Sequence, residues 1–168
     1  MARGNLLIWL VVAWLIPSAT LAQEAAVAVL DFELKNLTLA PDDPAERTRT
    51  ASLKALLEDA LSARHLRVVR VASSAQRLAD QGVGYLFDHA DAAATLGHTV
   101  GADWIVVGRV HKASFLFVYL KAHVVNVSNP SRMADLVVEV KGPQQELTQR
   151  GVESLADQIT AAVEGLSH

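Results

Sequence analysis

The chain has 168 residues, 51% of them hydrophobic, with 15 basic and 18 acidic residues and a formal net charge of −3. It contains no cysteine, which excludes disulfides, thiolate metal sites, cysteine nucleophiles and a lipid-modified N-terminal cysteine. It has no run of like charges and no basic amphipathic segment, so neither nucleic acid nor an anionic lipid surface is an expected partner.

The first residues have the pattern of an export signal. Arg3 supplies a positive charge, residues 6–16 form an apolar run, and residues 20–22 (TLA) provide the small residues of a cleavage site. The apolar run is shorter than the roughly 20 residues of a transmembrane helix. A retained membrane anchor is the alternative interpretation.

We therefore predict a signal peptide over residues 1–22, cleaved between Ala22 and Gln23, and one mature domain over residues 23–168. An exported chain without cysteine indicates the bacterial periplasm. We expect no stable membrane anchor after cleavage.

The first half of the mature chain alternates strands and helices. Residues 26–32 (AVAVLDF) form a nearly continuous apolar run, typical of a strand covered on both faces. After a polar loop, a helix is predicted from about residue 45, and a short strand follows at residues 65–71. The expected buried face of that helix consists of Leu53, Leu56, Leu57, Ala60 and Leu61. Ser73 and Asp88 are expected to cap two shorter helices, the first running through Asp80 and the second ending near Gly97 or Gly101.

The second half reads as three strands and a helix. Residues 104–110 (WIVVGRV) predict a central strand, in which Gly108 indicates a bulge or a close approach of backbone. Residues 115–124 alternate, and residues 126–131 predict a turn into a returning strand. The predicted core face of the first hairpin strand comprises Leu116, Val118, Leu120, Ala122 and Val124. The last helix has Val152, Leu155, Ala156, Ile159, Val163 and Leu166 at helical spacing.

The predicted order is β-α-β-α-α-β-β-β-α, an α/β (mixed α+β) fold. The alternating part implies parallel strands and the late part an antiparallel meander. We expect a single five-stranded mixed sheet with helices packed on it.

Three segments in this order resemble known domains. Residues 26–34 (AVAVLDFEL), 101–110 (GADWIVVGRV) and 120–142 (LKAHVVNVSNPSRMADLVVEVKG) are similar to the opening strand, central strand and hairpin of TolB amino-terminal-like and CsgG-like domains. The chain most resembles uncharacterised secreted bacterial proteins carrying a related domain of unknown function. The resemblance implies a non-enzymatic interaction module of the cell envelope. It does not extend to a lipid-anchor cysteine, a membrane-inserting hairpin or a β-propeller.

No motif of a catalytic, cofactor or metal site is present, and we predict none. The GxG at residues 82–84 reads as a helix end. The histidine pairs His89/His98 and His111/His123 lack ligand spacing. Asp31 and Asp103 adjoin apolar runs, and either belong to a site at the strand ends or make turn and backbone hydrogen bonds.

A row of aromatic residues is the predicted partner surface. Phe115, Phe117 and Tyr119 alternate with the core face, and Lys121 and His123 continue the row as a polar rim. Either a helix covers these aromatic residues or they form an exposed strip. The same strand could also be a sheet edge, which leaves a homo-oligomer open.

The functional hypothesis is therefore a periplasmic interaction or accessory module, without cofactor, that contacts an envelope protein. One alternative is a small-ligand-binding protein, with a crevice at the carboxyl ends of the parallel strands near Asp31, Ser73 and Arg109. Another is an accessory factor of a periplasmic dehydrogenase system. A hydrolase lacks any supporting motif.

Overall fold

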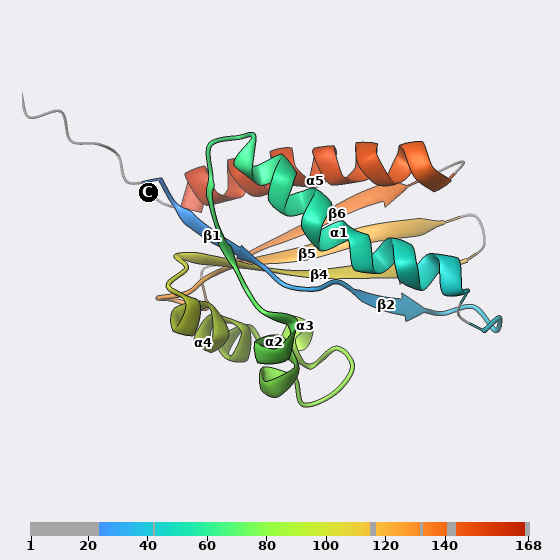
Figure 1. Ribbon diagram of the computed structural model, residues 1–168, viewed down its shortest axis with the longest axis horizontal. Coiled ribbons are helices and arrows are strands. Elements are labelled where there is room, and N and C mark those ends of the chain that lie inside the picture. Colours follow the sequence, from blue (N-terminus) through green and yellow to red (C-terminus); the bar gives the residue numbers. More distant parts are fainter. Residues whose placement is uncertain (1–23, 42, 115–116, 132, 141–143, 167–168) are drawn as a thin grey trace, which may run out of the picture.

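The computed structural model describes residues 24–41, 43–114, 117–131, 133–140 and 144–166 (Figure 1). The strands are β1 (Ala26–Val29), β2 (Glu33–Asn36), β3 (Arg67–Arg70), β4 (Trp104–Lys112), β5 (Val118–Asn126) and β6 (Met133–Val140). The helices are α1 (Pro44–Ser62), α2 (Ser73–Ala79), α3 (Tyr85–Asp88), α4 (Ala90–Val100) and α5 (Gln144–Leu166). The predicted signal peptide, its cleavage site at Ala22 and Gln23, and Phe115 and Leu116 lie outside the described residues and stay predictions.

The six strands form one mixed sheet in the order β3-β1-β4-β5-β6, with β2 also paired to β4. β1 pairs in parallel with β3 and β4, and β2 pairs in parallel with β4. β5 and β6 continue the sheet as antiparallel strands. The predicted mixed α/β fold with its parallel and antiparallel halves is confirmed, with one strand more than the five expected.

The additional strand arises because the strand predicted at residues 26–32 is interrupted. The Leu30 amide still donates to the Val106 carbonyl at 3.0 Å, but the Asp31 amide donates instead to the Gln76 side chain at 2.7 Å. Phe32 then crosses over Gly108, and its ring occupies the space that a β-carbon at residue 108 would need. The group that approaches Gly108 is therefore a side chain and not the backbone that was predicted, and β4 pairs with β5 through Gly108 without a bulge. Beyond it, β2 runs along the second half of β4.

α1 and α5 cover one face of the sheet, the upper one in Figure 1. Asp43 caps α1 by accepting a hydrogen bond from the Ala45 amide at 2.9 Å, and Pro44 occupies the first turn. The predicted buried face of α1 is confirmed except at Leu56, whose residue is 39% exposed. The spacing of Leu56 predicts that it shares the buried face of α1. In the structure, α5 and the sheet pack against the side of α1 that carries Leu53, Leu57, Ala60 and Leu61, and Leu56 lies beside that contact. The predicted core residues of α5 from Val152 to Val163 are all buried.

α2, α3 and α4 cover part of the opposite face. Ser73 was predicted as the N-cap of α2, but it is the first residue of that helix; Ala72 is the N-cap, and α2 ends at Ala79. His89, not Asp88, is the N-cap of α4, which ends at Val100 with Gly101 as its C-cap. No helix among the described residues is long and apolar enough to span a membrane.

The hairpin of β5 and β6 has the predicted two-sided pattern. Leu120, Ala122 and Val124 are buried against α1 and α5. The turn predicted at residues 126–131 is confirmed, with the Asn126 side chain accepting from the Asn129 amide at 2.8 Å. The alternate residues of β5 therefore lie on the face that α2, α3 and α4 only partly cover.

Candidate interaction surface

Phe87 of α3 marks the border between the covered and uncovered halves of the second sheet face. Its ring lies 3.8 Å beneath the Arg109 guanidinium and 3.9 Å from the His123 ring, centre to centre. On one side of this border, β1, the start of β4 and the end of β5 pack under α3 and α4. On the other side no described helix lies against the sheet (Figure 1).

A buried arginine fixes α3 and its preceding loop to the sheet at this border. Arg109 is 6% exposed and forms ion pairs with Glu33 of β2 and, at 3.7 Å, with Asp88 of α3. Gly84 allows the loop to approach: its φ is 85°, and a β-carbon there would lie 2.8 Å from the Arg109 Nη2. The cation is neutralised where it is buried, as burial of a charge requires.

Beyond this border lies an uncovered surface, which we call the open face. It comprises Lys35, His111, Tyr119, Lys121, Val137 and Glu139, and we add Phe117, which directly precedes β5 and continues the alternation of Tyr119 and Lys121. The sheet register places these side chains in rows: Lys35, His111, Tyr119 and Glu139 are successive neighbours across four strands, and Lys121 lies beside Val137 in the next row. His111, Tyr119 and Lys121 are half-buried by their neighbours in the sheet, whereas Val137 is 53% and Phe117 41% exposed.

The predicted surface residues fall on this face with one difference. Phe117, Tyr119 and Lys121 belong to the open face, and no described helix covers them. His123, expected at a polar rim, lies instead at the border, where Phe87 packs on its ring and Asp135 forms an ion pair with it at 3.2 Å. The uncovered part of the predicted row therefore ends at Lys121 and not at His123. A charged residue, Glu139, lies beside it on the neighbouring strand.

Four open-face residues were not predicted as part of the partner surface: Lys35, His111, Val137 and Glu139. Lys35 lies in β2, which was not predicted, because the residues around it have the composition of a polar loop. His111 and Val137 follow the alternation of their own strands, which could have identified their side of the sheet. Their place beside Tyr119 and Lys121 depends on the strand register.

The electrostatic environment at the centre of the open face is positive. Burial lowers the pKa of His111 below 6.5, and the charges of Lys121, Lys35 and Arg109 lower it further. The ring of His111 also lies 6.4 Å from that of Tyr119, centre to centre. The neutral imidazole is thus the favoured form of this residue.

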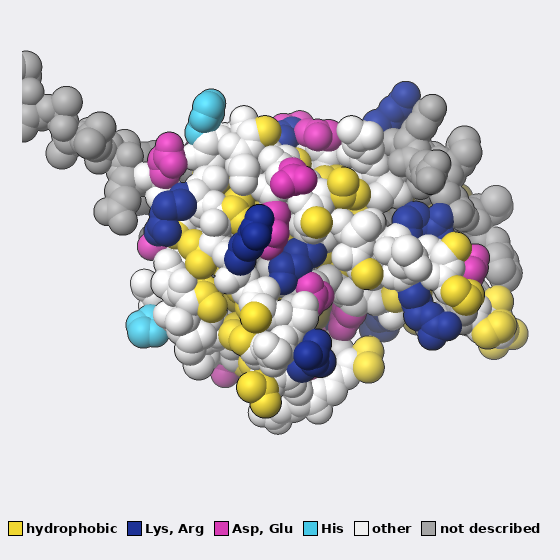
Figure 2. Space-filling view, in the orientation of Figure 1, with side chains coloured by type: hydrophobic (Ala, Val, Ile, Leu, Met, Phe, Trp, Pro, Cys, Tyr) yellow, Lys and Arg dark blue, Asp and Glu magenta, His cyan; other side chains and the backbone are white. Residues whose placement is uncertain are grey.

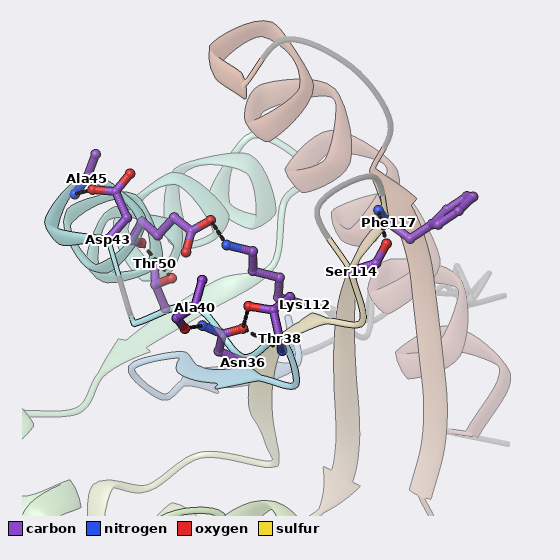
Figure 3. A network of polar contacts seen from close by, with 10 residues as sticks. Asn36, Thr38, Ala40, Asp43, Ala45, Thr50, Lys112, Ser114 and Phe117 are labelled. Carbon is purple, nitrogen blue, oxygen red and sulfur yellow. Dashed lines mark hydrogen bonds and ion pairs between the residues drawn. The ribbon is translucent and has the colours of Figure 1, made fainter.

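One end of the open face continues into a braced loop at residues 37–41 (Figure 3). The Asn36 side chain accepts from the Thr38 amide at 2.9 Å and donates to the Ala40 carbonyl at 3.1 Å. This loop carries Leu37 and Leu39, which are 55% and 106% exposed. Figure 2 shows hydrophobic side chains gathered at this end of the molecule. Apolar groups are therefore held in solvent beside the open face.

Two of the three residues named for a small-ligand crevice, Asp31 and Arg109, have partners within the protein. Asp31 forms an ion pair with Lys54 at 3.2 Å. The Asp31 amide donates to the Gln76 side chain, and the Asp31 carbonyl accepts from the same side chain. Arg109 is held at the Phe87 border. Asp103 accepts from the Ala26 amide at 2.8 Å, the backbone hydrogen bond that was one of its two predicted roles.

A metal centre and a ligand pocket are the other kinds of site to consider among the described residues. Within the described residues, no cluster of His, Asp and Glu side chains is arranged to hold a metal ion. A shallow hollow on α5 is lined by Gln149, Arg150, Glu153, Ser154 and Asp157. Two of these carboxylates already bind Arg64, at 2.7 and 2.8 Å.

The fold defines a small mixed α/β domain of the kind found in a bacterial lipoprotein. The crystal structure of lipoprotein GNA1162 from Neisseria meningitidis matches with a TM-score of 0.55 and 14% identity, covering 81% of this chain and 96% of that chain. The chain belongs to the family DUF3280, described as "Protein of unknown function (DUF2380)", whose model matches residues 25–159.

Two further solved structures are similar at lower scores. The LpoB C-terminal domain from Salmonella enterica has a TM-score of 0.42 and 12% identity, over 70% of this chain and 83% of that chain. TolB from Acinetobacter baumannii has a TM-score of 0.48 and 16% identity, over 85% of this chain but 29% of that chain. No curated protein matches the sequence. The predicted membership of a family of unknown function is confirmed by the family model, and the TolB-like and CsgG-like parts of the resemblance stay predictions.

Proposed function

We propose that this protein is a non-enzymatic interaction module of the bacterial cell envelope, located in the periplasm, and that it binds a partner protein through the open face. The observation that carries the proposal is the half-uncovered sheet. Soluble monomers seldom leave apolar side chains together on a regular sheet face, and such surfaces mark contacts with other molecules.

The composition of the surface supports a protein partner. Phe117 and Tyr119 offer aromatic area, a residue type that is enriched where proteins meet. Val137 lies on the edge strand β6, opposite Lys121 of β5, and 53% of its surface is exposed. Leu37 and Leu39 extend the apolar area at one end.

The envelope location is supported by two separate features. The first residues have the composition of an export signal. A structural neighbour with the same fold is a lipoprotein. Both are compatible with a mature protein that meets its partner in the periplasm.

The test is photocrosslinking in living cells. A photoreactive amino acid is placed at Val137 or Phe117, and in a matched control at Leu78, a 90% exposed hydrophobic residue on α2. We expect an adduct of one defined mass from Val137 and Phe117 and none from Leu78. Val137→Lys should abolish the adduct formed at Phe117 and leave the melting temperature unchanged, because position 137 is exposed.

Equal labelling from all three positions would mean that the open face is ordinary surface. If Val137→Lys instead unfolds the protein, position 137 belongs to the core and the proposed surface is wrong.

A further inference from the structure

The unpaired charges of the open face are cationic. Lys35 is exposed on β2 and Lys121 is half-buried on β5, on either side of His111 of β4. Among the residues that the structure describes, no salt bridge joins either lysine to a carboxylate. In this part of the chain, these two ammonium groups therefore have no carboxylate partner on the open face.

The carboxylates of this region are engaged or lie at its margins. Glu33 and Asp88 are bound to Arg109, and Asp135 to His123. Glu139 lies on the edge strand β6 and has a contact of its own. Glu139 thus lies at one end of the row that crosses the four strands and Lys35 at the other, while Lys121 lies on β5 between β4 and β6. After burial, the charges of Lys121 and Lys35 contribute to the lowered pKa of His111 between them.

We propose that the open face binds an acidic segment of a partner protein, whose carboxylates contact Lys35 and Lys121 and whose apolar side chains contact Phe117 and Val137. The inference rests on the function proposed above. Opposite charges across an interface select the partner and set the register of contact. The methylene stems of the two lysines can lie along apolar side chains of the segment while their ammonium groups meet its carboxylates.

An anionic membrane fits the same lysines less well. Val137 is flanked along β6 by Asp135 and Glu139, both exposed. A lipid surface that reached Val137 would bring its negative headgroups against these two carboxylates. A protein segment can place its carboxylates over β2, β4 and β5 and its apolar groups over β6.

The test uses the soluble protein labelled with nitrogen-15 and two synthetic peptides. In one peptide glutamates alternate with leucines, and in the other lysines replace the glutamates. We expect the glutamate peptide to shift amide resonances of β2, β4 and β5 around Lys35, His111 and Lys121. Lys35→Glu/Lys121→Glu should weaken its binding by at least about tenfold, and the lysine peptide should bind that variant better than the wild type.

The matched control is Arg67→Glu/Arg77→Glu, which changes the net charge by the same amount at exposed positions of β3 and α2. It should leave the affinity for the glutamate peptide unchanged. Because Lys121 is half-buried, Lys35→Glu alone serves as a second variant at an exposed position. It should weaken binding severalfold and keep the wild-type melting temperature.

The inference is wrong if the glutamate peptide does not bind, or if it binds the two double variants equally. It is also wrong if phosphatidylglycerol vesicles bind through Lys35 and Lys121 in place of the peptide. A dimer that is dissolved by the same substitutions would identify a second copy of the chain as the occupant. If Val137→Lys abolishes the adduct in cells but Lys35→Glu/Lys121→Glu does not, the proposed function stands and the acidic segment is excluded.

Discussion

Gly108→Ala tests the contact that separates β1 from β2 and so places Lys35 on the open face. A β-carbon at residue 108 would overlap ring carbons of Phe32, far closer than the roughly 3.5–4.0 Å at which carbon atoms attract. Phe32 is 7% exposed and belongs to the core under α1 and α5. The ring therefore has little room to move away.

The expected cost combines two opposing effects. Overpacking a well-filled core costs about 1–3 kcal/mol. Replacing glycine by alanine in a strand returns about 0.5–1 kcal/mol, because alanine loses less backbone entropy on folding. We expect a net destabilisation of about 1–2 kcal/mol, which for a domain of this size lowers the melting temperature by about 2–8 °C.

Urea denaturation followed by circular dichroism measures this difference. The control is Gly165→Ala in α5, where a β-carbon meets nothing within 4 Å, so no loss of stability is expected. The decisive comparison is with Phe32→Leu. If the ring is the obstacle, Gly108→Ala should cost less than about 0.5 kcal/mol in the Phe32→Leu background. An equal cost in both backgrounds would refute the reasoning, because the strain would then come from the backbone and not from Phe32.

Three other outcomes depend on charged or titratable side chains. Arg109→Met should destabilise the protein by about 3 kcal/mol in urea denaturation, because Glu33 loses its partner in a poorly solvated place, and adding Glu33→Gln should recover part of the loss. Burial raises the pKa of Glu58 above 4.5, so the ionised carboxylate destabilises the folded state relative to the unfolded state. Glu58→Gln should therefore raise the melting temperature at neutral pH. This gain should vanish as the pH falls below 4.5, where the carboxyl is protonated in both states. His111 has a lowered pKa, so its contribution to stability is complete above pH 6.5 and is lost as the pH falls through its folded-state pKa. His111→Asn should flatten that part of the stability curve, and an unchanged slope would assign it to other groups.

The elements that could be predicted from sequence are those whose patterns are local and long. α5 presents an apolar residue at nearly every turn, and the hairpin alternates over both of its strands. Such patterns depend only on which side of an element meets the core. The central strand was equally clear because the sheet and both helical layers bury residues 104–110 completely.

β2 shows what local patterns cannot reveal. Its four residues, ELKN, include no β-branched or aromatic side chain, and nothing in them favours a strand. They are extended because β4 is longer than β1 and leaves backbone groups free beyond Val106, which β2 then pairs. The cause lies in a strand more than seventy residues away. Lys35 was missed for this reason.

The open face itself follows from unequal element lengths. β4 has nine residues and spans about 30 Å at roughly 3.3 Å per residue, and α5, with 23 residues, is about 35 Å long and covers that length. On the other side, α4 has 11 residues and is only about 16 Å long, and α3 adds a single turn. Helices of this size can shield about half of β4, so its second half must carry side chains that tolerate water. Arg109 and His111 stand where Ile105 and Val107 stand in the covered half. The change from apolar to polar residues along one side of a single strand therefore records where the helical cover ends, and a partner surface is best sought beyond that point.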